Sequence, residues 1–282
     1  MHASDQLLHA IDLAGAPVCV GLDPVLERLP RSLQPGEPPV ARIEAFCARI
    51  IEAVSGVAPA VKPQSACFER YGHDGVAALE RIIAMAHSAG LVVILDAKRG
   101  DIGVSAEHYA SAAFAPPAPA HWITVNSYLG ADGITPFLRD GHGAFALVRT
   151  SNPGGDALQN LKLADGRTVA AAVADLVAEI GASHMGDGGY SDLGAVVGAT
   201  KGADIALLRQ RMPHTIFLVP GYGAQGGSLN DILASFNPDR RGALINASRS
   251  IIYAFEPDDP SWIDAVRNAA VEMKGELGRG LG

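Results

Sequence analysis

Two oppositely charged side chains stand two residues apart at the end of an apolar run, in the segment LVVILDAKRGD. Asp96 and Lys98 should project to the same side of an extended strand, because successive side chains alternate between its faces. Asp101 follows after a short turn, and Lys62 ends another apolar run. Neighbouring carboxylates favour the charged form of a lysine while burial disfavours it. The array therefore predicts an ammonium that is held charged and aimed at a reacting atom.

The alternative for these residues is a structural ion-pair network at a strand end. The catalytic interpretation is favoured because polar residues also end, or closely follow, several other apolar runs: Asp23, Lys62, Ser151, Gln225 and Arg249. In a barrel of parallel strands, such ends converge on one face.

A second feature is the glycine-rich segment PGYGAQGG at 220 to 227, followed by Arg249 in SRS. Glycines allow backbone N–H groups to face an anion, and the planar guanidinium can grip two phosphate oxygens. A flexible turn is the alternative. PGYGAQGG follows the seventh predicted strand of the chain and Arg249 follows the eighth. Because the loops after these two strands bind phosphate in many barrels, this position favours a phosphate site.

Short β-rich runs recur along the chain, and most are near-continuously apolar, which is typical of strands buried on both faces of a parallel sheet. The runs cover 16 to 24, 59 to 65, 91 to 99, 121 to 128, 143 to 154, 194 to 200, 215 to 223 and 242 to 250.

Helical patterns lie between these runs, at 39 to 55, 74 to 89, 168 to 180, 203 to 212, 228 to 236 and 258 to 275. The clearest, 39 to 55, places its apolar residues on one helical stripe. In the second, Asp74 is the expected N-cap and Gly90 ends the helix. Residues 152 to 168 are expected to form a long loop.

Eight strands alternating with helices predict a single (β/α)8 TIM barrel over residues 1 to 282, with additional N-terminal and C-terminal helices. A doubly wound sheet is the alternative, but it more often uses five to seven strands. The sixth strand and the glycine-rich stretch 181 to 194 are the least distinct parts of the pattern.

Composition narrows the function. Lys plus Arg is 22 and Asp plus Glu is 30, which gives a net charge of −8 and argues against a nucleic-acid surface. The cysteines, Cys19, Cys47 and Cys67, show no disulfide or zinc spacing, and the histidines form no metal-binding motif. From these spacings we expect a protein without a metal. The sequence also shows no signal peptide and no apolar run long enough for a membrane span, so we expect a cytoplasmic protein.

Six motifs together resemble the orotidine 5′-phosphate decarboxylase family. They are VGLDP, VKPQSACFERYG, DAKRGDIG, TSNPG, PGYGAQGG and SRS, which run in family order between residues 20 and 250. The KPQ, KRGDIG and SNPG forms are similar to those of the longer bacterial subgroup called type 2. The DxKxxD pattern alone would also fit related sugar-phosphate decarboxylases.

The resemblance implies conversion of orotidine 5′-monophosphate (OMP) to UMP and CO2, the last step of de novo pyrimidine biosynthesis, without cofactor or metal. By motif position, Lys98 is the proton donor to C6, flanked by Asp96 and Lys62. Asp101 completes the array from the other subunit of a homodimer.

The same resemblance assigns the substrate contacts. Asp23 binds the ribose, and Ile102 and Ser105 reach the partner's site. The remaining contacts are Ser151 and Pro220 at the pyrimidine, and Gln225 and Arg249 at the phosphate. Two positions depart from the family's usual pattern: residue 105 is Ser rather than Thr, and residue 67 is Cys. Neither removes a required functional group.

Three other functions remain open at this point. A strand-end lysine such as Lys98 or Lys62 can form a Schiff base in an aldolase. A metal-dependent sugar-phosphate decarboxylase would share the barrel and the phosphate loop. A catalytically silent nucleotide-binding protein would retain the loop without turnover, although the intact charged array argues against it.

Overall fold

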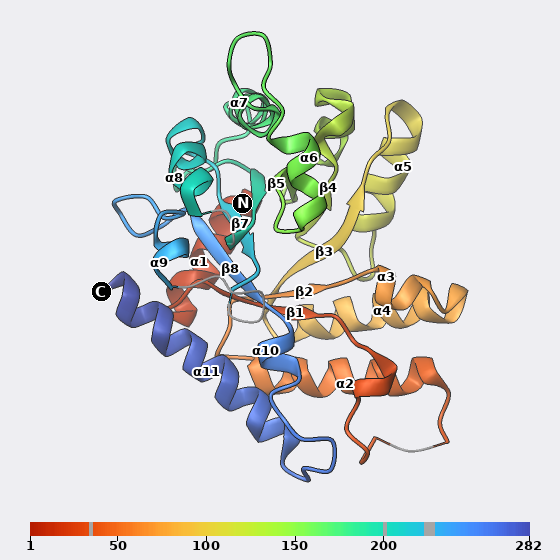
Figure 1. Ribbon diagram of the computed structural model, residues 1–282. Coiled ribbons are helices and arrows are strands. Elements are labelled where there is room, and N and C mark those ends of the chain that lie inside the picture. The colour runs from red at the N-terminus through yellow and green to blue at the C-terminus, as the bar shows by residue number, and fades with distance from the viewer. Residues whose placement is uncertain (34–35, 200–201, 223–228) are drawn as a thin grey trace.

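The structure is a computed structural model that describes all residues except 34–35, 200–201 and 223–228. In this described part, eight parallel strands close into a barrel in sequence order, which confirms the predicted (β/α)8 architecture (Figure 1). The strands are β1 (Val18–Leu22), β2 (Ala60–Pro63), β3 (Val92–Arg99), β4 (Trp122–Val125), β5 (Gly143–Arg149), β6 (Leu193–Val197), β7 (Phe217–Pro220) and β8 (Ala243–Ala247).

The helices surround this barrel. Their bounds are α1 (Ala3–Ala14), α2 (Pro39–Val54), α3 (Ala66–Glu69), α4 (Gly72–Ser88), α5 (Gly103–Phe114), α6 (Asp156–Gln159), α7 (Val169–Gly181), α8 (Gly202–Arg211), α9 (Leu229–Leu233), α10 (Arg249–Ile252) and α11 (Trp262–Leu281). Short 3-10 turns occupy Leu26–Arg28, Ser127–Leu129, Ala131–Gly133, Thr135–Phe137 and Pro153–Gly155.

The predicted helices are present with shifted ends. In α2, Ile43, Phe46 and Ile50 of the predicted stripe are buried. Helix α4 begins at Gly72, so the expected N-cap, Asp74, instead lies in its first turn. Its carboxylate there faces the positive end of the helix dipole. The terminal helix α11 begins and ends later than predicted.

The structure contains helical segments that the sequence did not predict, among them the short helices α3 and α10. Residues 152 to 168 were expected to be a loop, but they contain a 3-10 turn, α6 and an antiparallel bridge between Lys162 and Thr168. Helix α5 was not predicted. Its buried face consists largely of alanines, Ala106, Ala110 and Ala113, which give a weak apolar pattern.

The inside of the barrel is apolar near its base and polar near its mouth. Trp122 and Phe145 fill the lower part, with ring centroids 4.5 Å apart. Two residues further along β4, Thr124 faces the same way, and the neighbouring strands place Lys62 and Asp96 at this level. Alternate strand residues point inward, and toward the carboxyl ends of β2, β3 and β4 these inward residues are Lys62, Asp96 and Thr124, so polar side chains collect at the mouth.

Candidate active site

A cavity of about 630 Å³ opens at the carboxyl ends of the strands. Its walls include Lys62, Asp96, Lys98, Ser151 and Pro220, and parts of the 150–159 segment. The structure therefore brings these five sequence-predicted residues together. The cavity has both charged and apolar walls and is large enough for a small organic ligand.

The charged array lies along one side of this cavity. Lys62 Nζ is 2.5 Å from Asp96 Oδ2, and Lys98 Nζ is 2.6 Å from Asp96 Oδ1. The Lys62 and Asp96 side chains are only 6% and 8% exposed, whereas that of Lys98 is 48% exposed. Of the two lysines, Lys98 is therefore the one that can meet a ligand with little rearrangement.

The pKa of Asp96 reflects these neighbours. Burial by itself raises the pKa, but the positive charges and hydrogen bonds of Lys62 and Lys98 outweigh it and lower the pKa of Asp96 to about 2. For Lys62, burial lowers the pKa, while the charges of Asp96 and Asp23 raise it, and the net shift is upward. Both members of the buried pair are therefore held in their charged forms at neutral pH.

Two further side chains bind Asp96, and sequence reasoning did not include them. Gln64 Nε2 donates to Asp96 Oδ2 at 3.3 Å, and Thr124 Oγ1 donates to Asp96 Oδ1 at 2.9 Å. Gln64 follows Lys62 by two residues in KPQ, so strand alternation was a usable signal for it. Thr124 carried no such signal, because its nearness to Asp96 depends on the pairing of β3 with β4.

Asp23 lies just after β1, near the array. Its Oδ1 is buried and has no hydrogen-bond partner among the described residues, a state that a bound hydroxyl group would relieve. Gly21 precedes it in VGLDP, where a Cβ atom would lie 2.8 Å from Cβ of Ser248. The glycine thus allows the segment that leads into Arg249 to approach β1 closely.

Asp101, Ile102 and Ser105 do not join the array within one chain. The Asp101 carboxylate accepts the N–H of Ile102 at 2.9 Å, and Ile102 and Ser105 are exposed. None of the three lines the cavity. Their expected role belongs to a second subunit and stays a prediction.

The predicted phosphate residues are less fully described. Arg249 begins α10 directly after β8, at the same end of the barrel, and is exposed rather than in the cavity wall. Gln225 and most of PGYGAQGG lie outside the described residues.

The described residues offer neither a metal site nor a membrane span. No group of three or more His, Cys, Asp or Glu side chains there is arranged to hold a metal ion. No helix in the same part of the chain is long and apolar enough to cross a membrane.

A closed (β/α)8 barrel with lysine and aspartate side chains around a cavity at the carboxyl ends of its strands defines a class of barrel enzymes. Residues 16–259 match the model of the orotidine 5′-phosphate decarboxylase / HUMPS family. The chain belongs to this family.

Individual relatives extend this match over nearly the whole chain. The orotidine 5′-phosphate decarboxylase of Rhodopirellula baltica is 43% identical over 300 residues, covering 98% of this chain and 99% of that protein. That of Herpetosiphon aurantiacus is 44% identical over 254 residues, covering 90% and 89%. The OMP decarboxylase structure from Leishmania donovani is 36% identical with a TM-score of 0.81, covering 100% of this chain and 99% of that one.

Proposed function

We propose that this protein is a carboxy-lyase that converts OMP to UMP and CO2, the last step of de novo pyrimidine biosynthesis. The observation that carries the proposal is the Lys62–Asp96–Lys98 array on the wall of the cavity. Full-length relatives named orotidine 5′-phosphate decarboxylase support the choice of reaction. The three free cysteines fit the reducing cytoplasm, where we place the enzyme.

The chemistry explains why a lysine is needed. When the bond from C6 to the carboxylate breaks, CO2 leaves and the electron pair stays on C6, in the plane of the pyrimidine ring. This pair cannot delocalise into the π system, so the activation barrier is high. The enzyme must therefore lower that barrier by an amount near the upper end of the roughly 8–23 kcal/mol that enzymes achieve.

Lys98 acts on that developing charge. Its ammonium is attracted more strongly to C6 as negative charge appears there than to the neutral carbon of the substrate, which is differential binding of the transition state. Lys98 Nζ then transfers a proton to C6, giving UMP, and water restores the ammonium. Asp96 holds Lys98 in position through the 2.6 Å ion pair.

Substrate binding completes the proposal. Asp23 offers a carboxylate oxygen without a partner to a ribose hydroxyl, while Ser151 and Pro220 line the part of the cavity assigned to the pyrimidine. Arg249 and Gln225 are assigned to the phosphate. The phosphate lies far from C6, but its binding energy can order the site around the base.

We expect Arg249→Ala to lower kcat/KM for OMP by roughly 10²-fold, because a charge-assisted contact is lost. Orotidine, which has no phosphate, should be turned over equally slowly by the variant and by the wild type. Steady-state kinetics with both substrates make the comparison. An equal loss on orotidine would show that Arg249 does not act on the phosphate.

The proposed enzyme is a homodimer with shared sites. Beside the mouth, Ile102 and Val104 of the α5 region and Tyr128 and Leu129 of the following turn are exposed apolar side chains. Helix α5 contacts the Ala131–Gly133 turn, which in turn contacts the Ser127–Leu129 turn, so we take these exposed side chains as one surface for a second copy. Asp101 beside them would then enter the partner's array.

Mixing two inactive variants tests the shared site. Half of the dimers formed by subunit exchange between Lys98→Ala and Asp101→Ala would be mixed, each with one intact site, so about a quarter of wild-type activity should return. Sedimentation should show a dimer. Activity no greater than that of the separate variants would contradict the shared site.

The proposed reaction is tested directly by following the loss of OMP absorbance with purified, EDTA-treated protein, and by identifying UMP and CO2 as products. Turnover that needs an added divalent cation would instead indicate the metal-dependent sugar-phosphate decarboxylases. Trapping of a carbonyl substrate with borohydride would indicate a Schiff-base enzyme. Tight UMP binding without any turnover would indicate a silent nucleotide-binding protein.

A further inference from the structure

We propose that Thr124 is a positioning residue that fixes the backbone and ammonium of Lys98 for proton transfer. This inference rests on the proposed decarboxylase function. Thr124 lies on β4, is 1% exposed, and contributes to the cavity wall next to the array. Its role follows from three features of the β3–β4 pair.

The first feature is an irregular pairing. Leu95 pairs with Ile123 and Arg99 pairs with Val125, so the register shifts between these two points. Three residues of β3, Asp96 to Lys98, therefore lie opposite Thr124 alone. The irregularity interrupts the regular backbone ladder at the reacting lysine.

The second feature is the conformation of Lys98. Its φ angle is +44°, in the left-handed region that side-chain-bearing residues seldom adopt because it is strained for them. A conformation of this kind persists only where the surroundings hold it. Since φ sets the direction of the Cα–Cβ bond, it also sets where the ammonium can reach.

The third feature is a closed ring of hydrogen bonds through one hydroxyl. Thr124 Oγ1 accepts the backbone N–H of Lys98 at 2.9 Å and donates to Asp96 Oδ1 at 2.9 Å. The same Asp96 oxygen receives Lys98 Nζ at 2.6 Å. Thr124 thus replaces the missing ladder partner of Lys98 and at the same time fixes the carboxylate that holds the ammonium.

Removing the Thr124 hydroxyl leaves the Lys98 N–H without this acceptor, and Asp96 Oδ1 loses the hydrogen bond that the hydroxyl donates. The ammonium should then sample positions away from C6, and a displacement of about 1 Å can cost on the order of 10² in rate. The ribose and phosphate contacts come from other strands, so substrate binding should change little.

Two matched pairs of side chains separate this role from packing. Thr and Val have nearly the same shape and differ in the hydroxyl, as do Ser and Ala at a smaller size. We expect Thr124→Val and Thr124→Ala to lower kcat by roughly 10- to 100-fold with KM changed by less than about threefold. Thr124→Ser should keep kcat within about fivefold of the wild type.

A packing role would give the opposite order, because Val fills the site and Ser leaves a void. The inference is overturned if kcat follows side-chain size, or if KM rises while kcat holds. Should Thr124→Val fail to fold, Thr124→Cys replaces it, because Cys is at least as large as Ser but its thiol is only a weak hydrogen-bond group. A hydroxyl role then gives a lower kcat for Cys than for Ser, and a packing role gives an equal or higher one. Thr215→Val, at a buried position at the base of the barrel, is the matched control and should retain wild-type kcat.

The wild type separates the two hypotheses. A wild-type protein that does not convert OMP would overturn the proposed function and, with it, the inference about Thr124. An active wild type with an equally active Thr124→Val would remove only the inference about Thr124.

Discussion

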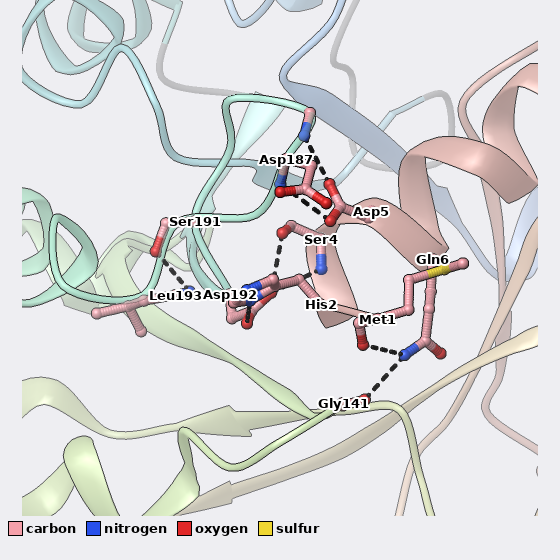
Figure 2. Close-up of polar contacts among 11 residues, drawn as sticks. Met1, His2, Ser4, Asp5, Gln6, Gly141, Asp187, Ser191, Asp192 and Leu193 are labelled. Atoms are coloured by element: carbon pink, nitrogen blue, oxygen red, sulfur yellow. Dashed lines mark hydrogen bonds and ion pairs between the residues drawn. The ribbon is translucent and has the colours of Figure 1, made fainter.

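The two ends of the barrel each hold a buried aspartate, and they differ in what surrounds it. At the mouth, Asp96 is 6% exposed and binds two lysines. At the base, Asp192 is 5% exposed and accepts hydrogen bonds from the backbone and hydroxyl of Ser4, both at 2.8 Å. His2 Nδ1 lies 2.7 Å from its second oxygen (Figure 2).

Access accounts for the difference between these two carboxylates. The partners of Asp192 come from the N-terminal segment and α1, which packs Ala3, Leu7 and Leu8 against the interior of the barrel. The base is thereby closed. At the mouth, Lys98 is half exposed to a cavity, so the same kind of ion pair remains available to a ligand. Polar groups at the base are thus placed to serve stability, and those at the mouth are the ones that we propose serve chemistry.

The packing of α1 against the base also explains why the stretch 181 to 194 is rich in glycine. Asp5 of α1 accepts the N–H groups of Asp187 and Gly188 at 3.0 and 2.8 Å. Figure 2 shows Asp5 beside Asp187. A Cβ atom at Gly186 would lie 2.5 Å from Ser4 Oγ. Glycine is needed there because the helix and the turn are in such close contact.

The largest effect should come from Lys98→Ala at the mouth. We expect turnover of OMP to fall by roughly 10⁴-fold or more, because both charge stabilisation and the proton donor are lost. The melting temperature should stay near that of the wild type, since the Lys98 side chain is half exposed. Near-normal UMP formation by the folded variant would remove Lys98 from the mechanism.

Asp96→Asn should reduce both activity and stability. It leaves the buried Lys62 ammonium without its counter-charge, which costs about 3–5 kcal/mol of unfolding free energy. Denaturant unfolding and kcat measure the two effects. In the wild type, the depressed pKa means that this stabilisation is present above the unfolded value of 3.8 and is lost as pH falls toward about 2.

Asp192→Asn should reduce stability alone. The loss of charge-assisted hydrogen bonds to Ser4 and His2 should cost about 1–3 kcal/mol. Per folded molecule, kcat for OMP should equal that of the wild type, because the change lies at the closed end. A clear fall in kcat with unchanged stability would contradict the hypothesis that polar groups at the base affect stability alone.

The smallest effect should be a pH dependence at the base. The hydrogen bond to Asp192, with its charge, raises the pKa of His2 above 6.5. The stabilisation is therefore fully present below pH 6.5 and is lost as pH rises through the raised value. Because the His2 side chain is nearly half exposed, water screens the pair and the change in Tm should be only about 1 °C. His2→Gln should abolish this difference between pH 6 and pH 9.

The sequence allowed the mouth to be predicted better than the base. Asp96 and Lys98 share one strand, so their spacing alone places them on one side. Lys62 joins them because parallel strands end at the same face of a barrel. Asp192, by contrast, meets Ser4 across 188 residues, and nothing local to either residue indicates that contact.

By itself, the sequence determined the alternation of strands and helices, the barrel, and the lysine–aspartate pair, because each depends on periodicity within a short segment or on the common direction of the strands. Only the tertiary structure decided that Thr124 lies against Asp96 and Lys98, that Lys98 takes a left-handed backbone, and that α1 closes the base. These features depend on register between strands and on contacts between distant segments, which are settled only when the whole chain packs.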